Sequence, residues 1–155
     1  MILEMTSTSI PALNSGDTIA AIATAVSPGQ GGIAVIRLSG PQAQKAVRAV
    51  VCIPGAQIWD SHRVLYGHAL AADGVQHIDE VLVLVMLGPR SFTGEDVVEI
   101  HCHGGVMAVQ QVLDRVLEQT DVRRALPGEF SQRAVLNGRL DLTRAEAISD
   151  LVAAR

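Results

Sequence analysis

Aromatic residues, lysine and cysteine are scarce in this sequence, and each shortage excludes certain kinds of core, site or binding surface. Only 3% of its 155 residues are aromatic, so a hydrophobic core has to be built from Val, Ile, Leu and Ala. Cys52 and Cys102 are far apart and form no CxxC motif, which argues against a disulfide framework and a structural zinc site. Lys45 is the only lysine among twelve basic residues, and the net charge of −4 argues against a broad nucleic-acid-binding surface.

Long apolar runs and familiar catalytic motifs are also missing. The longest apolar run, Val81–Leu87, is too short to cross a membrane, and residues 1–16 lack the basic start of a signal peptide. We therefore expect a cytoplasmic protein that does not enter a membrane. The glycine-rich loop Pro28–Gly32 lacks the GK[ST] ending of a phosphate-binding loop, and no GxSxG motif is present. These residues predict neither nucleotide hydrolysis nor serine-hydrolase chemistry.

The hydrophobic pattern that is present predicts an α+β fold. Apolar segments of strand length and amphipathic helical segments predict a mixed sheet of about five to six strands with helices packed on it. The expected strands are Thr18–Thr24, Ile33–Ser39, Val64–Ala72, Glu80–Leu87, Glu95–Cys102 and, at an edge, Val122–Leu126. Helices are expected after Pro41, over Val106–Thr120, after Pro127 and from Thr143 onward. Because Glu80–Leu87 is nearly all apolar, it predicts a central strand that is covered on both faces.

Two charged residues stand out because apolar residues surround them. Arg37 lies in a strand that is otherwise apolar, where a guanidinium needs an anionic partner. In the strand that carries Glu99, alternation directs Val98 and Ile100 to the core, so Glu99 and His101 face the opposite surface. Glu99 is therefore the candidate partner of Arg37, either as one wall of a binding site or as half of a buried ion pair.

A third charged residue, Arg139, follows the helix-ending pair Asn137-Gly138. A long side chain in that position can reach back over a pocket, and arginines hold carboxylates through paired hydrogen bonds. Composition and spacing alone predict one acid and two arginines, Glu99, Arg37 and Arg139, around a pocket. A surface salt bridge explains Arg139 equally well.

The segment His101-Cys102-His103 is the best candidate for a metal site, and it is a weak one. Alternation in a strand places His101 and His103 on one side and Cys102 on the other. Two ligands are too few for zinc, and the other three histidines have no ligand spacing relative to this pair. We therefore expect no metal site here.

Six blocks of residues carry a resemblance to a known family. They are Asp17–Ala20, Pro28–Gly40, Ser91–Glu99, His103–Gly105, Pro127–Phe130 and Leu136–Ala147. In the same order and at compatible spacing, they resemble the N-terminal part of the MnmE (TrmE) family of tRNA modification GTPases. The resemblance extends from about Asp17 to the end of the chain.

The resemblance implies a folate-binding domain. Its fold would be similar to the tetrahydrofolate-binding domains of one-carbon enzymes, and it would form a homodimer with the folate pocket near the interface. The family's folate-binding residues correspond to Arg37, Glu99 and Arg139 in this sequence. These three residues would bind 5-formyltetrahydrofolate or 5,10-methylenetetrahydrofolate. The resemblance implies no catalytic residue and no metal ligand in this segment. The alternative is a domain for assembly alone, in which Arg37 and Glu99 form a buried ion pair and no ligand binds.

The resemblance also implies a larger enzyme and a division of this chain. With the flavoprotein MnmG (GidA), the family installs an aminomethyl or carboxymethylaminomethyl group at C5 of the wobble uridine of tRNA, using folate-borne carbon. Its GTPase domain binds GTP, Mg²⁺ and K⁺. Within this chain we expect a flexible tail at 1–16, the folate-binding and dimerisation domain at 17–126, and a helical connection with the first helix of a helical domain at 127–155.

Three departures from the family pattern bear on these expectations. Gln30 stands where arginine is common, and Arg139 replaces the commoner lysine, which keeps the charge but changes its geometry. No phosphate-binding loop is present, so this chain alone is not expected to hydrolyse GTP. The sequence is expected to be either a fragment or a truncated copy kept for binding or dimerisation, and the last predicted helix, which runs to Arg155 without a C-terminal cap, favours a fragment.

Overall fold

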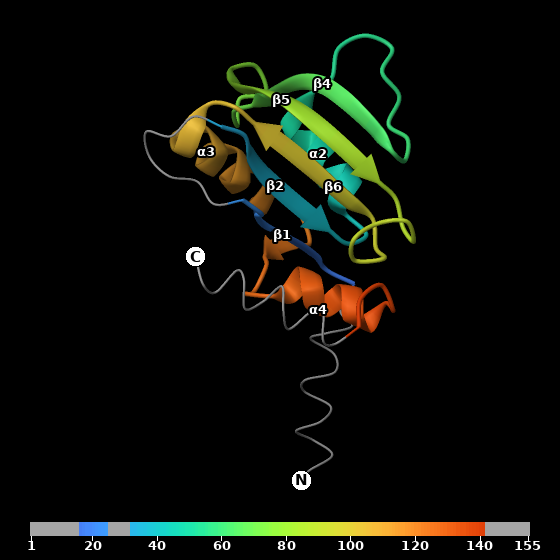
Figure 1. Ribbon diagram of the computed structural model, residues 1–155. Coiled ribbons are helices and arrows are strands. Elements are labelled where there is room, and N and C mark those ends of the chain that lie inside the picture. Colours follow the sequence, from blue (N-terminus) through green and yellow to red (C-terminus); the bar gives the residue numbers. More distant parts are fainter. Residues whose placement is uncertain (1–15, 25–31, 142–155) are drawn as a thin grey trace.

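Seven strands form one mixed sheet with three helices in the computed structural model, which describes residues 16–24 and 32–141 (Figure 1). The strands are β1 Thr18–Ile22, β2 Ala34–Ser39, β3 Val51–Cys52, β4 Arg63–Leu70, β5 His77–Met86, β6 Val97–Cys102 and β7 Val122–Arg124. The helices are α2 Ala43–Val50, α3 Gly105–Leu117 and α4 Glu129–Leu136. The predicted α+β fold is confirmed, with one strand more than expected.

The strand order is β3-β4-β5-β6-β2-β1-β7, and the neighbours are antiparallel except for the parallel pair β1 and β7. Strands β1 and β2 pair antiparallel, and the predicted edge strand β7 is confirmed. The unpredicted strand is β3, whose two residues are too few to show an alternation. A Cβ atom at Gly67 of β4 would lie 2.1 Å from the carbonyl oxygen of Cys52 in β3, so this close pairing depends on glycine.

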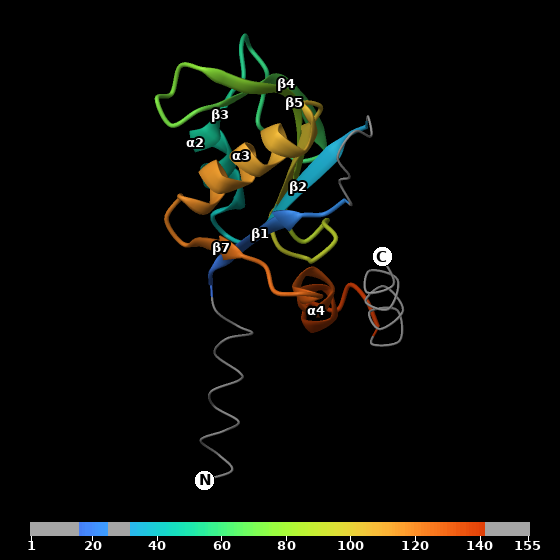
Figure 2. The same cartoon turned by 90° about the vertical axis from the view of Figure 1, so that its left-hand side faces the viewer.

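Helices α2 and α3 cover the same face of the sheet (Figures 1 and 2). The apolar stripe of α2, namely Ala43, Ala46, Val47 and Val50, is buried as its periodicity predicts. The prediction that β5 is covered on both faces is wrong. Val81, Val83 and Val85 are fully buried, whereas the alternate residues of β5 are only partly buried, because the helices lie on one side.

The uncovered side of the sheet, which we call the open face, presents both apolar and charged residues. Val64 and Tyr66 of β4 are 60% and 42% exposed, and their neighbours across the sheet are residues of β5 and β6. By strand alternation, the residues of the open face include Val64, Tyr66, His68, Glu80, Leu82, Leu84, Met86, Arg37, Glu99 and His101.

Helix α4 lies beyond the edge of the sheet formed by β1 and β7, apart from α2 and α3 (Figure 2). Among the described residues, no helix has the length and apolarity needed to cross a membrane. The predicted tail and the helix expected from Thr143 lie outside the described residues. The division of the chain at residue 126 stays a prediction.

Candidate functional site

Arg37 and Glu99 form an ion pair on the open face. They lie opposite each other in the register of β2 and β6, and Arg37 Nε donates a hydrogen bond of 2.8 Å to Glu99 Oε2. The second carboxylate oxygen, Oε1, lies 3.0 Å from Nε2 of His101. Glu99 is nearly buried, with 9% of its surface exposed, whereas the side chain of Arg37 is 27% exposed. The sequence-based pairing of Arg37 with Glu99 is therefore observed.

Glu99 is held in its ionised form by these two partners. Burial alone raises the pKa of the Glu99 carboxyl, but hydrogen bonds from His101 and Arg37, together with their charges, outweigh burial and leave the pKa below its ordinary value. A carboxylate that stays ionised in a nearly dry setting can accept further N–H donors, since its two oxygens offer about four lone-pair sites in all.

The guanidinium of Arg37 also lies close to two phenylalanine rings. Its central carbon is 5.4 Å from the ring centroid of Phe92 and 5.7 Å from that of Phe130, within the range of cation–π attraction. Phe92 belongs to the loop before β6, and Phe130 belongs to α4. Two segments that are distant in sequence thus meet at one arginine of the sheet.

These three residues line a cavity of about 400 Å³. The rest of its wall comes from Ala21–Ala23 at the end of β1 and from the connection Arg124–Gly128 between β7 and α4. Within the described residues, the hydrogen bonds of the Arg37 side chain involve only Nε, so its two Nη groups remain available to a ligand. The cavity combines apolar walls with a small number of polar groups, as small-molecule sites do.

Arg139, the third residue predicted from the sequence, lies on a neighbouring loop. Its Nε donates a hydrogen bond of 2.9 Å to the carbonyl oxygen of Ser91, and a Cβ atom at Gly94 would lie 3.4 Å from its Cγ. It does not line the cavity of Arg37. The structure thus brings Arg37 and Glu99 together and places Arg139 against the loop that carries Phe92.

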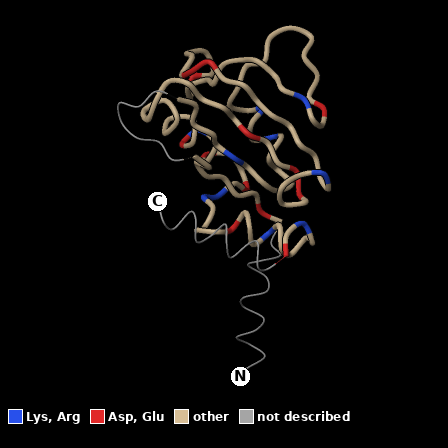
Figure 3. Tube along the Cα trace, in the orientation of Figure 1, with Lys and Arg blue, Asp and Glu red and all other residues tan. Residues whose placement is uncertain are grey.

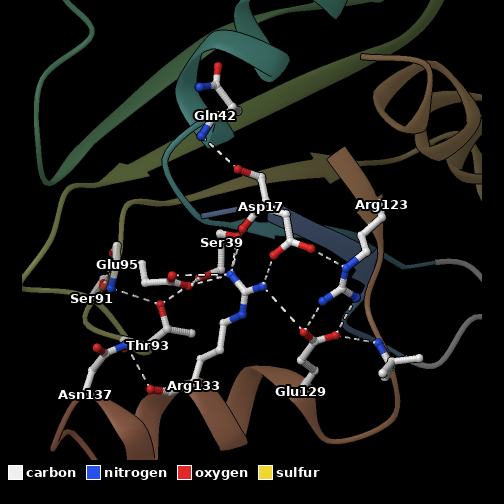
Figure 4. Close-up of polar contacts among 12 residues, drawn as sticks. Asp17, Ser39, Gln42, Ser91, Thr93, Glu95, Arg123, Glu129, Arg133 and Asn137 are labelled. Atoms are coloured by element: carbon white, nitrogen blue, oxygen red, sulfur yellow. Dashed lines mark hydrogen bonds and ion pairs between the residues drawn. The ribbon is translucent and has the colours of Figure 1, made fainter. Parts of the chain in front are cut away.

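A cluster of charged residues, absent from the sequence predictions, attaches α4 to the sheet (Figure 4), and two of its members, Arg133 and Glu129, are buried. Its centre is Arg133, whose side chain is only 4% exposed. Arg133 Nη2 lies 2.8 Å from Asp17 Oδ1 and 3.4 Å from Glu129 Oε2, and Nη1 lies 3.0 Å from Glu95 Oε1. Arg123 of β7 completes the cluster by pairing with Asp17 and Glu129. We call these five residues the α4 ionic network.

Glu129 of this network is ionised by its surroundings. Burial alone raises the pKa of its carboxyl, but hydrogen bonds from Arg123 and from the backbone N–H of Leu126, with the charges of Arg123 and Arg133, bring the pKa below its ordinary value. The hydrogen bond to Glu129 is also the main reason why the pKa of Arg123 is raised. Glu129 and Arg123 therefore carry opposite charges at neutral pH.

The histidines considered as metal ligands have other partners. His101 contacts Glu99, whereas His103 Nδ1 lies 3.1 Å from the carbonyl oxygen of Glu80. Residues 16–24 and 32–141 contain no group of three or more His, Cys, Asp or Glu side chains that could hold a metal ion.

Charge of both signs is spread along the described trace, and basic and acidic positions are interspersed in the view of Figure 3. The apolar residues of the open face, by contrast, are contiguous across β4 and β5, because Val64 pairs with Leu84 and Tyr66 pairs with Leu82. An exposed apolar area of this kind on a sheet is typical of an interaction surface.

Comparison with known proteins gives a consistent result. Residues 18–139 match the sequence profile of the family described as "GTP-binding protein TrmE N-terminus". Proteins named tRNA modification GTPase MnmE from Synechococcus sp. (strain CC9311) and Prochlorococcus marinus (strain MIT 9303) are 82% and 78% identical to this chain over 138 residues. The matched region covers 89% of this chain and 30% of each relative. The chain thus spans about 30% of the length of these curated relatives.

Proposed function

The chain belongs to the TrmE N-terminal family, and from this membership we propose that it is the folate-binding, homodimerising N-terminal part of a tRNA modification GTPase. The proposed ligand is 5-formyltetrahydrofolate or 5,10-methylenetetrahydrofolate. The proposed binding residues are Arg37, Glu99 and Arg139.

We propose that the whole protein is an enzyme that acts on tRNA in the cytoplasm. It would work with a flavoprotein of the MnmG type and use the folate-borne carbon to install a (carboxymethyl)aminomethyl group at C5 of the wobble uridine. GTP, Mg²⁺ and K⁺ would bind in a GTPase domain that this chain does not contain. The names of the relatives, tRNA modification GTPase MnmE, support the tRNA-modifying and GTPase parts of this proposal, and the family resemblance of the sequence suggests the rest.

The cavity beside Arg37 is the observation that carries the folate proposal. The pyrimidine ring of a reduced pterin is flat and carries N–H donors, and folates end in a glutamate with two carboxylates. Phe92 and Phe130 provide aromatic surface for such a ring, and the Nη groups of Arg37 can donate hydrogen bonds to ligand oxygens. The volume of about 400 Å³ falls in the range of small-molecule sites.

Glu99 does not itself line the cavity, but it accepts a hydrogen bond from Arg37, which does, and its carboxylate fits the same ligand. Each of its oxygens has one protein partner, which leaves lone pairs for two N–H donors of a heteroaromatic ring. Because Arg37 and His101 fix its position, Glu99 would orient the ring without a change of rotamer. Arg139 would contact the ligand from the neighbouring loop. Its hydrogen bond to the carbonyl oxygen of Ser91 holds its side chain in place there.

The test is calorimetric titration of the purified chain with 5-formyltetrahydrofolate. Saturable binding to the parent chain, lost in Glu99→Gln, is expected. Glu118→Gln is the matched control, since Glu118 is an exposed residue that pairs with Arg115 on α3, and it should bind like the parent. No binding by the folded parent chain would contradict the proposal, and parental binding by Glu99→Gln would contradict the role of Glu99.

The observed 2.8 Å ion pair favours one alternative, an assembly domain that binds no ligand. In that case Arg37 and Glu99 only stabilise the sheet. Neither the parent chain nor any variant would then bind folate. The same titration therefore separates the two functions.

The open face is the proposed homodimer surface, with a second copy of this chain as its occupant. The contiguous apolar residues of β4 and β5 support this proposal, since same-chain interfaces are richer in apolar area than the rest of a surface. Leu84→Asp should shift the protein to monomer in sedimentation velocity. Val75→Asp, which adds the same charge at a residue 77% exposed in the β4–β5 turn, should leave the association unchanged. A parent chain that sediments as a monomer at all concentrations would contradict the proposal.

A further inference from the structure

We propose that Arg133 is a positioning residue for the cavity of Arg37: it fixes the rotation and place of α4, and through α4 it sets the position of Phe130 against the Arg37 guanidinium. The inference rests on the proposed function only for the identity of the ligand. The geometry that it describes can be measured without a ligand.

The inward side of α4 is unusually polar. The buried residues of the helix are Glu129, Ser131, Arg133 and Ala134. A surface helix normally docks through an apolar stripe, which tolerates small rotations. Ala134 is the one fully buried apolar residue of α4, and Phe130 and Val135 are partly buried, so directional hydrogen bonds provide a large share of the contacts that attach the helix.

Arg133 supplies those directional bonds to several elements at once. Its Nη1 donates to the backbone oxygen of Asp17 at 3.0 Å and to Glu95 Oε1 at 3.0 Å, while its Nη2 donates to Asp17 Oδ1 at 2.8 Å. Figure 4 shows the guanidinium lying between these carboxylates. Since the guanidinium is rigid and planar, rotating α4 about its axis would break bonds on both Nη atoms.

The network joins the two aromatic walls of the cavity. Phe130 precedes Arg133 on α4, and Arg133 binds Glu95, which belongs to the same loop as Phe92. A second connection runs parallel to this one, because Asn137 Nδ2 donates a hydrogen bond of 2.9 Å to the carbonyl oxygen of Thr93. Moving α4 would therefore change the separation of the two rings that flank Arg37.

Lysine cannot replace Arg133 in this role. An ammonium group is a compact charge on a flexible stem. It can keep an ion pair with one or two of the carboxylates, but it cannot reproduce the rigid, planar arrangement of donors of a guanidinium. Arg133→Lys should therefore retain much of the charge compensation while it loses the orientation. This separates positioning from a general contribution to stability.

The first readout uses the fact that the chain has only two phenylalanines, Phe92 and Phe130, both of which flank Arg37. Labelling with 4-fluorophenylalanine places fluorine probes only at the walls of the cavity. In ¹⁹F NMR spectra of protein that circular dichroism shows to be folded, Arg133→Lys should shift or broaden the Phe130 resonance. Arg115→Lys, which replaces an arginine of α3 outside the network, should leave both resonances unchanged.

The second readout is a double-mutant cycle in the affinity for 5-formyltetrahydrofolate. Arg133→Lys and Phe130→Ala should each weaken binding by about tenfold, a change of about 1.4 kcal/mol. If Arg133 acts through Phe130, the double variant should bind no more than about twofold more weakly than Phe130→Ala alone, since coupled residues are not additive. Losses that multiply would overturn the inference.

Two results keep this inference distinct from the proposed function. A parent chain that binds no folate refutes the proposed function, but the ¹⁹F spectra still decide whether Arg133 positions Phe130. Parental ¹⁹F spectra in a folded Arg133→Lys variant overturn the positioning role even if the parent binds folate. Should that variant fail to fold, Glu95→Gln replaces it, because it alters one acceptor of Arg133 at a side chain that is 25% exposed, and it should move the same resonance to a smaller extent.

Discussion

Replacing Arg37 by methionine would test how much the ion pair with Glu99 stabilises the sheet. Methionine keeps the length of the apolar stem but removes the charge, so the nearly buried Glu99 carboxylate would retain only the contact with His101. Breaking a fully buried ion pair costs about 3–5 kcal/mol. Because the side chain of Arg37 is 27% exposed, water screens part of this interaction, and we expect a loss of about 2 kcal/mol.

The assay is urea unfolding at pH 7, followed by circular dichroism and by the fluorescence of the single tryptophan, Trp59. For a domain of this size, about 2 kcal/mol corresponds to a fall in Tm of about 4–8 °C. Glu99→Gln should cost a similar amount. The double variant Arg37→Met/Glu99→Gln should be more stable than the sum of the two losses predicts, by about 1–2 kcal/mol, because neither variant side chain then leaves an unpaired charge.

Additivity would refute this reasoning. If the double variant loses the sum of the two single losses to within about 0.5 kcal/mol, the two side chains do not stabilise each other, and the observed contact makes no contribution to folding. A change in the slope of the unfolding curve would show that the variant alters the unfolded ensemble, and the comparison would then need thermal unfolding as well.

Three further outcomes are expected. The lowered pKa values of Glu99 and Glu129 mean that their contribution to stability is complete above the ordinary value of 4.5 and is lost as the pH falls through the lower folded values. The urea concentration at the unfolding midpoint should therefore decrease as the pH is lowered below 4.5, and an unchanged midpoint would contradict this. Gly67→Ala places a Cβ atom 2.1 Å from the Cys52 carbonyl oxygen and should lower the free energy of unfolding, measured in urea, by more than about 2 kcal/mol. A variant as stable as the parent would show that β3 is easily displaced. Iodoacetamide should label the exposed Cys52 but not Cys102, because burial raises the pKa of the Cys102 thiol to about 12; mass spectrometry of the native protein checks this.

Much of the sheet follows from local pattern. The alternation of Val98, Glu99 and Ile100 is enough to place the carboxylate on the open face, and the polar break of an apolar strand is enough to identify Arg37. Only their pairing requires the register of β2 with β6. Strand β3 escaped detection because two residues have no period, and the cover of β5 was overestimated because an apolar strand does not reveal which of its sides a helix occupies.

The α4 ionic network could not be predicted in the same way. Arg133 lies in a helix whose charged residues are read as solvent-facing, yet it is buried because its acceptors come from Asp17, 116 residues away, and from Glu95, 38 residues away. No local pattern encodes such distances. Phe130 is distinguished in the sequence only as the last residue of the block Pro127–Phe130, and its contact with Arg37 depends on where that network places α4.

The separation of Asp17 from Arg133 also has a consequence in time. During synthesis at about 5–20 residues per second, Asp17 would leave the ribosome roughly 6–23 s before Arg133 is available to it. Strand β1 finds β2 early, but its other edge remains without β7 for most of that interval, and an unpaired edge can join with a strand of another nascent chain. Strand β1 therefore obtains its second neighbour, β7, late in the synthesis of this domain, and α4 joins Asp17 through Arg133 only after that.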